Sequence, residues 1–108
     1  FNEDSPYCLI PKSMKKLSIT EIDDNLKRIH SEWVLMNEVI QRKFVFDDFI
    51  EAFSFMTSVA IVAEKQNHHP NWENVYNQVI VNLSTHDADG ITEKDFKLAQ
   101  KMDQLFDS

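Results

Sequence analysis

The sequence contains few glycine, proline and cysteine residues and has no long apolar stretch. Its 108 residues include one glycine, three prolines and one cysteine, so an internal disulfide and a Cys-x-x-Cys site are both excluded. Cys8, as a single thiol, favours a reducing, intracellular location, which we expect to be the cytoplasm, with the nucleus as an alternative. The longest unbroken apolar stretch is residues 59–63, far short of the ~20 residues of a membrane span.

Basic side chains are also scarce relative to acidic ones. Eleven Lys and Arg residues stand against 18 Asp and Glu residues, a formal net charge of −7. An acidic protein repels phosphate backbones, so we expect no direct contact with nucleic acid. The 43% of hydrophobic residues and the length are instead typical of one domain with a packed core. We expect an extended or poorly ordered arm over residues 1–16 and a single domain over residues 17–108.

Three segments have the signals of helix starts. The first and last have the spacing of a capping box, in which a hydroxyl and a carboxylate satisfy each other's orphan amides. The middle helix begins after an aspartate that can cap it and runs to about residue 65. The capping residues are, in chain order, Ser18 with Glu21, either of Asp47 and Asp48, and Thr92 with Asp95.

Two pairs of strands are expected between these helices. Residues 33–46 alternate between the two faces and can turn near Asn37 and Glu38, and residues 72–85 alternate in the same way. The order is therefore helix, strand, strand, helix, strand, strand, helix. Paired strands with short connections predict an α+β domain, with a four-stranded antiparallel sheet and three helices on one face.

The middle helix is more apolar than a surface helix requires. Its apolar residues form two adjacent stripes that cover much of its circumference. A domain of this size has no core large enough to bury both, so we expect one stripe to lie at a subunit interface. The stripes are Phe49, Phe53, Met56, Ala60 and Ala63, and Ala52, Phe55, Val59 and Val62.

Three of the four histidines, His68, His69 and His86, lie in or beside the last strand pair. Histidine can donate and accept protons near neutral pH. Pro70 favours an extended backbone before it, which would send the side chains of His68 and His69 to opposite sides. The alternatives are loop histidines without a role, hydrogen-bonding braces, or a three-histidine zinc site. Adjacent extended residues rarely converge on one ion, which weighs against zinc.

The segment Glu64-Lys65-Gln66-Asn67-His68-His69-Pro70, with the later Thr85-His86, Gly90-Ile91-Thr92 and Asp95, resembles the pterin-4a-carbinolamine dehydratase family. This family is also known as the dimerisation cofactor of a homeodomain transcription factor. The resemblance covers residues 17–106. It implies the same α+β fold, a homodimer or homotetramer, and removal of water from 4a-hydroxytetrahydrobiopterin to give quinonoid dihydrobiopterin. It implies neither a redox cofactor nor a metal.

The resemblance also assigns the site. It implies that His68, His69 and His86 are catalytic, with His68 and His86 handling protons and His69 orienting the pterin. The other residues implied to bind substrate are Pro70, Thr85, Asp87, Ala88, Trp33 and Glu64. Family members often have an acidic residue where this chain has Asn67, so the charge beside the histidine pair differs. A second hypothesis is a non-catalytic coactivator whose middle helix binds a transcription-factor partner, but three retained histidines favour the enzyme.

Overall fold

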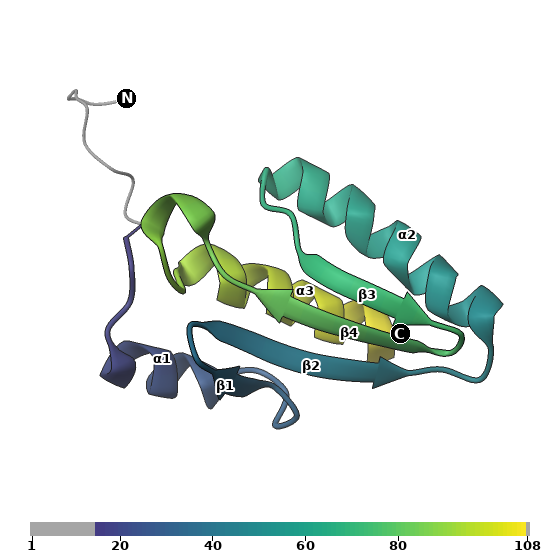
Figure 1. The fold of residues 1–108 in the computed structure, drawn as a ribbon, viewed down its shortest axis with the longest axis horizontal. Helices are drawn as coiled ribbons and strands as arrows, with labels where there is room; N and C mark the ends of the chain where they lie inside the picture. Colours follow the sequence, from purple (N-terminus) through teal and green to yellow (C-terminus); the bar gives the residue numbers. More distant parts are fainter. Residues whose placement is uncertain (1–14, 108) are drawn as a thin grey trace.

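The structure, a computed structural model, describes residues 15–107. The arm predicted for residues 1–16 therefore lies outside the described residues except at its last two positions. The elements follow the predicted order (Figure 1). They are α1 (Ile19–Leu26), β1 (Val34–Met36), β2 (Val39–Val45), α2 (Phe49–Gln66), β3 (Asn71–Val75), β4 (Gln78–Leu83), a short 3₁₀ helix η2 (His86–Ala88), and α3 (Glu93–Asp107).

The four strands form one antiparallel sheet in the order β1-β2-β4-β3, which confirms the predicted α+β class. Each hairpin closes through two residues, Asn37-Glu38 between β1 and β2 and Tyr76-Asn77 between β3 and β4. The first residue of each turn has a left-handed backbone, with φ of 57° at Asn37 and 53° at Tyr76. Asparagine tolerates this conformation better than tyrosine does, because its short side chain can bond locally.

The core lies on one face of the sheet. Alternate residues of the two central strands point to this face, where they meet buried side chains from all three helices. In Figure 1, α3 passes behind the central strands. The most deeply buried members are Ile40 and Phe44 of β2, Val79, Val81 and Leu83 of β4, Ala52 and Val59 of α2, and Leu98, Ala99 and Met102 of α3.

The first two helix starts form as the sequence predicts. The Ser18 hydroxyl accepts from the Glu21 amide at 3.2 Å, and the Ser18 amide donates to the Glu21 carboxylate at 2.9 Å. Asp48 accepts from the Glu51 amide at 2.9 Å and so caps α2. These local bonds fix where α1 and α2 begin, and through α2 they set the position of the histidine pair at its other end.

One apolar face of α2 remains uncovered by the described residues. Ala52, Phe55 and Val59 are buried in the core, whereas Phe53 is 54% exposed and Ile50 is 74% exposed. Contiguous exposed apolar side chains of this size often mark an interaction surface. No helix within residues 15–107 is long and apolar enough to cross a membrane.

Candidate active site

A polar hollow of about 220 Å³ lies where the end of α2, the end of β4 and the start of α3 meet. It is smaller than the roughly 300–1,000 Å³ of a drug-sized ligand site, and it suits a compact ring better than a long chain. All three histidines of the predicted site line it. The full lining is Asn67, His68, His69, Ser84, Thr85, His86, Asp87 and Lys94.

The end of α2 turns His68 into the protein. Asn67 ends the helix in the left-handed conformation with φ of 53°, and its amide donates to the carbonyls of Ala63 and Glu64. The His68 amide also bonds to the Ala63 carbonyl, at 3.0 Å. A left-handed residue at this position reverses the chain direction and is commonly glycine or asparagine. Asn67 is therefore suited to this backbone.

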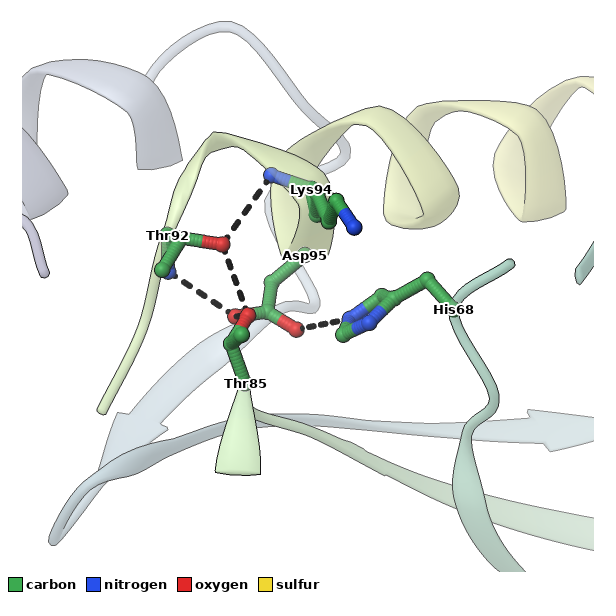
Figure 2. Close-up of polar contacts among 5 residues, drawn as sticks. All are labelled: His68, Thr85, Thr92, Lys94 and Asp95. Atoms are coloured by element: carbon green, nitrogen blue, oxygen red, sulfur yellow. Dashed lines mark hydrogen bonds and ion pairs between the residues drawn. The ribbon is translucent and has the colours of Figure 1, made fainter. Parts of the chain in front are cut away.

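His68 is buried, with 8% of its surface exposed, and its Nε2 lies 2.5 Å from Oδ1 of Asp95. Asp95 belongs to the first turn of α3 and is fully buried. Its second oxygen, Oδ2, accepts from the Thr92 amide at 2.9 Å and from the Thr85 hydroxyl at 3.0 Å (Figure 2). One carboxylate thus caps α3, as predicted, and also braces an imidazole from another element.

His69 has a different environment from that of His68. Its side chain is 62% exposed, and its Nε2 lies 2.9 Å from Oε1 of Glu64, whose side chain is 80% exposed. The two adjacent histidines have different partners, although both line the hollow. Glu64 is placed to brace His69 from one turn earlier in the chain, while His68 receives its brace from α3.

His86 reaches the hollow from a short 3₁₀ turn that follows β4. β4 ends at Leu83, and Thr85 and Gly90 then form a single antiparallel bridge that closes a tight loop. Within that loop, His86 begins η2, and Asp89 takes a left-handed φ of 55° to end it. His86 is exposed and lines the hollow from this turn and not from an extended strand.

The remaining predicted substrate contacts divide into two groups. Thr85 and Asp87 line the hollow, whereas Pro70 and Ala88 are half-buried neighbours of lining residues. Trp33 is not among the lining residues. It is 3% exposed, packs edge-on against Phe44 with ring centres 6.0 Å apart, and donates its indole N–H to Asp103 at 2.8 Å.

Sequence reasoning missed the role of Asp95 at this site, together with three further lining residues, Asn67, Ser84 and Lys94. The spacing of Thr92 and Asp95 signals a helix cap, which the structure contains. No local pattern indicates that the same carboxylate meets a histidine 27 residues earlier. That contact depends on how α3 packs beside the end of α2.

The side chains around the hollow are suited to moving protons. The hollow brings together three imidazoles, one of which is held by a buried carboxylate, and one lysine. A larger groove of about 430 Å³ between α2 and α3 is lined mainly by phenylalanine, serine and aliphatic side chains, with Glu51 as its one titratable group. Within residues 15–107, no three His, Cys, Asp or Glu side chains are grouped so that they could hold a metal ion.

Comparison with known proteins shows which family the chain resembles. The family described as Pterin 4 alpha carbinolamine dehydratase matches residues 15–105. A protein of Christiangramia forsetii, provisionally named pterin-4-alpha-carbinolamine dehydratase, is 50% identical over 95 residues, which are 88% of this chain and 97% of that protein. A protein of Sinorhizobium fredii with the same provisional name is 56% identical over 92 residues, covering 83% of this chain and 87% of that protein.

A solved structure is similar as well. The crystal structure of a transcriptional coactivator/pterin dehydratase from Brucella melitensis superposes with a TM-score of 0.81 and is 42% identical in sequence. The match covers 84% of this chain and 98% of that one. The name that these relatives share is that of a hydro-lyase. By sequence and by fold, this chain belongs to the pterin-4-alpha-carbinolamine dehydratase family.

Proposed function

We propose that this protein removes water from a 4a-hydroxytetrahydropterin, with 4a-hydroxytetrahydrobiopterin as the expected substrate, and releases the quinonoid dihydropterin. The observation that carries the proposal is the grouping of His68, His69 and His86 around one hollow, with buried Asp95 behind His68. The dehydratase relatives support the reaction class. Because these relatives are bacterial, we propose the cytoplasm alone as the location.

The reaction needs one proton delivered and one removed. The bond between C4a and the hydroxyl oxygen breaks, and the oxygen leaves as water only if it gains a proton. The neighbouring ring nitrogen loses its proton, and its electron pair forms the new double bond to C4a. Atoms and charge then balance without an oxidant, a reductant or another reactant.

The geometry of the site suggests how the histidines divide this work. His68 and His86 come from different elements and both line the hollow, so they can serve different atoms of one bound ring. We assign proton transfer to these two residues. His69, exposed and paired with Glu64, orients the ring at the mouth of the hollow. General acid–base catalysis of this kind contributes about 10²–10⁴-fold.

The test is a direct dehydration assay. An aromatic amino-acid hydroxylase generates the 4a-hydroxytetrahydropterin, and its loss is followed by ultraviolet absorbance with wild type, His68→Ala and His30→Ala. His30 lies outside the hollow and serves as the matched control. We expect rapid loss with wild type and His30→Ala and a rate about 10²–10⁴-fold lower with His68→Ala. A wild-type rate equal to that of buffer would contradict the proposal.

The exposed face of α2 favours self-association. Phe49, Ile50, Phe53 and Ile61 are each at least 46% exposed, and removing apolar surface from water is stabilising by roughly 25 cal/mol per Å². We propose that a second copy of this chain covers them, in a homodimer or homotetramer. A monomer in light scattering at micromolar concentration would overturn this.

The Brucella protein is described as a transcriptional coactivator as well as a dehydratase. Coactivation is therefore the second candidate function for the exposed face of α2, with a helix of a partner protein in place of the second copy.

A further inference from the structure

Two buried hydroxyl groups lie behind the carboxylate that braces His68. Thr85 is 3% exposed and Thr92 is fully buried, and their Oγ1 atoms lie 2.6 Å apart (Figure 2). The Thr85 hydroxyl is 3.0 Å from Oδ2 of Asp95, and the Lys94 amide donates to the Thr92 hydroxyl at 3.2 Å. A helix cap requires the Thr92 and Asp95 groups but does not require Thr85, so the pair of hydroxyls needs a separate explanation.

The available hydrogens give this chain of bonds a direction. Each hydroxyl has one hydrogen to donate. The Thr85 hydrogen goes to Oδ2 of Asp95, so Thr85 accepts its contact with Thr92, and the Thr92 hydrogen must lie between the two hydroxyls. The Thr92 oxygen in turn accepts from the Lys94 amide. Every hydrogen then has an acceptor, and the chain of donors points toward Asp95.

Asp95, as a carboxylate, only accepts hydrogen bonds. Oδ2 receives two of them, from the Thr85 hydroxyl and the Thr92 amide. Oδ1 is then an acceptor for His68, 2.5 Å away. A neutral imidazole that donates from Nε2 carries no hydrogen on Nδ1, which has no partner among the described residues.

We infer that Thr85 and Thr92 are positioning residues whose hydroxyls, acting through Asp95, hold His68 in the Nε2–H form, so that Nδ1 keeps a lone pair that can accept a proton. This inference rests on the proposed function and names the atom that performs it. Nδ1 of His68 takes the proton from the pterin, and the imidazolium that forms is stabilised by Asp95. Without the two hydroxyls, Oδ2 would keep only its bond from the Thr92 amide.

The test reads the tautomer directly. Long-range proton–nitrogen correlation spectra of protein labelled with ¹⁵N-histidine distinguish a protonated from an unprotonated ring nitrogen, and His68→Ala assigns the His68 signals. We expect wild type to show the Nε2–H form of neutral His68. We expect Thr85→Val and Thr92→Val to mix in the Nδ1–H form and to lower kcat about 10- to 100-fold with KM nearly unchanged.

Two controls separate positioning from folding. Thr85→Ser restores the hydroxyl and should restore both the tautomer and kcat, whereas Thr57→Val removes a hydroxyl that bonds only within α2 and should change neither. An Nδ1–H form in wild type would overturn the inference, as would valine variants with wild-type spectra and kcat. The tautomer is read without turnover, so a protein that fails to dehydrate the pterin overturns the proposed function while the spectra still decide this inference.

Discussion

Asp95 and Asp103 both lie on α3, eight residues apart. Each carboxylate contacts three hydrogen-bonding groups. Asp95 meets His68, Thr85 and Thr92 beside the hollow. The partners of Asp103 are the His30 amide at 3.1 Å, the Trp33 indole at 2.8 Å and the Arg42 guanidinium at 2.6 Å. Only the first set includes a side chain that gains and loses a proton near neutral pH.

The difference indicates that the Asp95 cluster belongs to a chemical site and the Asp103 cluster has a structural role. Arginine keeps its charge under all ordinary conditions, and the indole and amide N–H groups donate hydrogen bonds without losing their protons near neutral pH. Arg42 is 4% exposed, its guanidinium lies 4.3 Å from the centre of the Phe44 ring, and its Nε has no partner among the described residues. The Asp103 cluster therefore ties β2 and the segment after α1 to α3, while the Asp95 cluster connects a proton-exchanging group to the hollow.

The largest expected effect comes from breaking the first cluster. We expect His68→Ala and Asp95→Asn each to lower kcat, the former by about 10²–10⁴-fold. The double variant should be no slower than the slower single variant, because the two residues act as a unit. A double-variant rate equal to the product of the two single effects would mean that Asp95 acts independently of His68. The dehydration assay with all four proteins measures this.

Breaking the second cluster should affect stability and leave chemistry intact. Asp103→Ala leaves the Arg42 charge buried without a counterion, which costs about 3–5 kcal/mol of unfolding free energy. Urea unfolding measures the loss. Asp23→Ala, which removes only an exposed pair with Lys27, is the control and should cost less than about 1 kcal/mol. A loss of activity per folded molecule in Asp103→Ala would assign this cluster a part in the reaction.

Two residues with a left-handed backbone allow a similar comparison between the site and a distant turn. Asn67 beside the hollow and Tyr76 in the distant β3–β4 turn have the same left-handed φ of 53°. Replacing Asn67 with alanine should cost about 1 kcal/mol of stability, because alanine fits this conformation poorly, whereas Tyr76→Asn should gain several tenths of a kcal/mol. Thermal unfolding of both variants tests the pair, and a stabilised Asn67→Ala would contradict the assignment of Asn67 as the residue that ends α2.

The smallest expected effect concerns the exposed histidine. Glu64→Gln removes the charge next to His69, and both side chains are more than half exposed. Exposed pairs are worth about 0–1 kcal/mol, so we expect stability to change by no more than that and KM to rise less than about fivefold. Steady-state kinetics at fixed ionic strength gives the value. A fall in kcat comparable with that of His68→Ala would transfer the main catalytic role to His69.

Local signals in the sequence account for most of the fold. Capping-box spacing predicts where α1 begins, and alternation predicts both hairpins, because these patterns depend on residues a few positions apart. The two apolar stripes predict an open face on α2, and Phe49 and Phe53 of the first stripe are exposed, although Ala63 of the same stripe is buried.

Contacts between distant segments could not be derived in this way. The resemblance to a family locates the three histidines, but the brace from Asp95 spans 27 residues and the Arg42–Asp103 pair spans 61. Trp33 illustrates the same limit. Its indole binds Asp103 and lies in the core, a placement that depends on how α3 packs against β2 and that the chain around Trp33 does not encode.

The most direct test compares the two carboxylates in one assay. Asp95→Asn and Asp103→Asn are chemically identical changes on the same helix, and the dehydration rate per folded molecule is measured for both at a temperature where urea unfolding shows each to be folded. We predict that Asp95→Asn is at least about 100-fold slower than Asp103→Asn, which should retain nearly the wild-type rate. Equal rates, or a slower Asp103→Asn, would contradict the assignment of the chemistry to the His68–Asp95 pair.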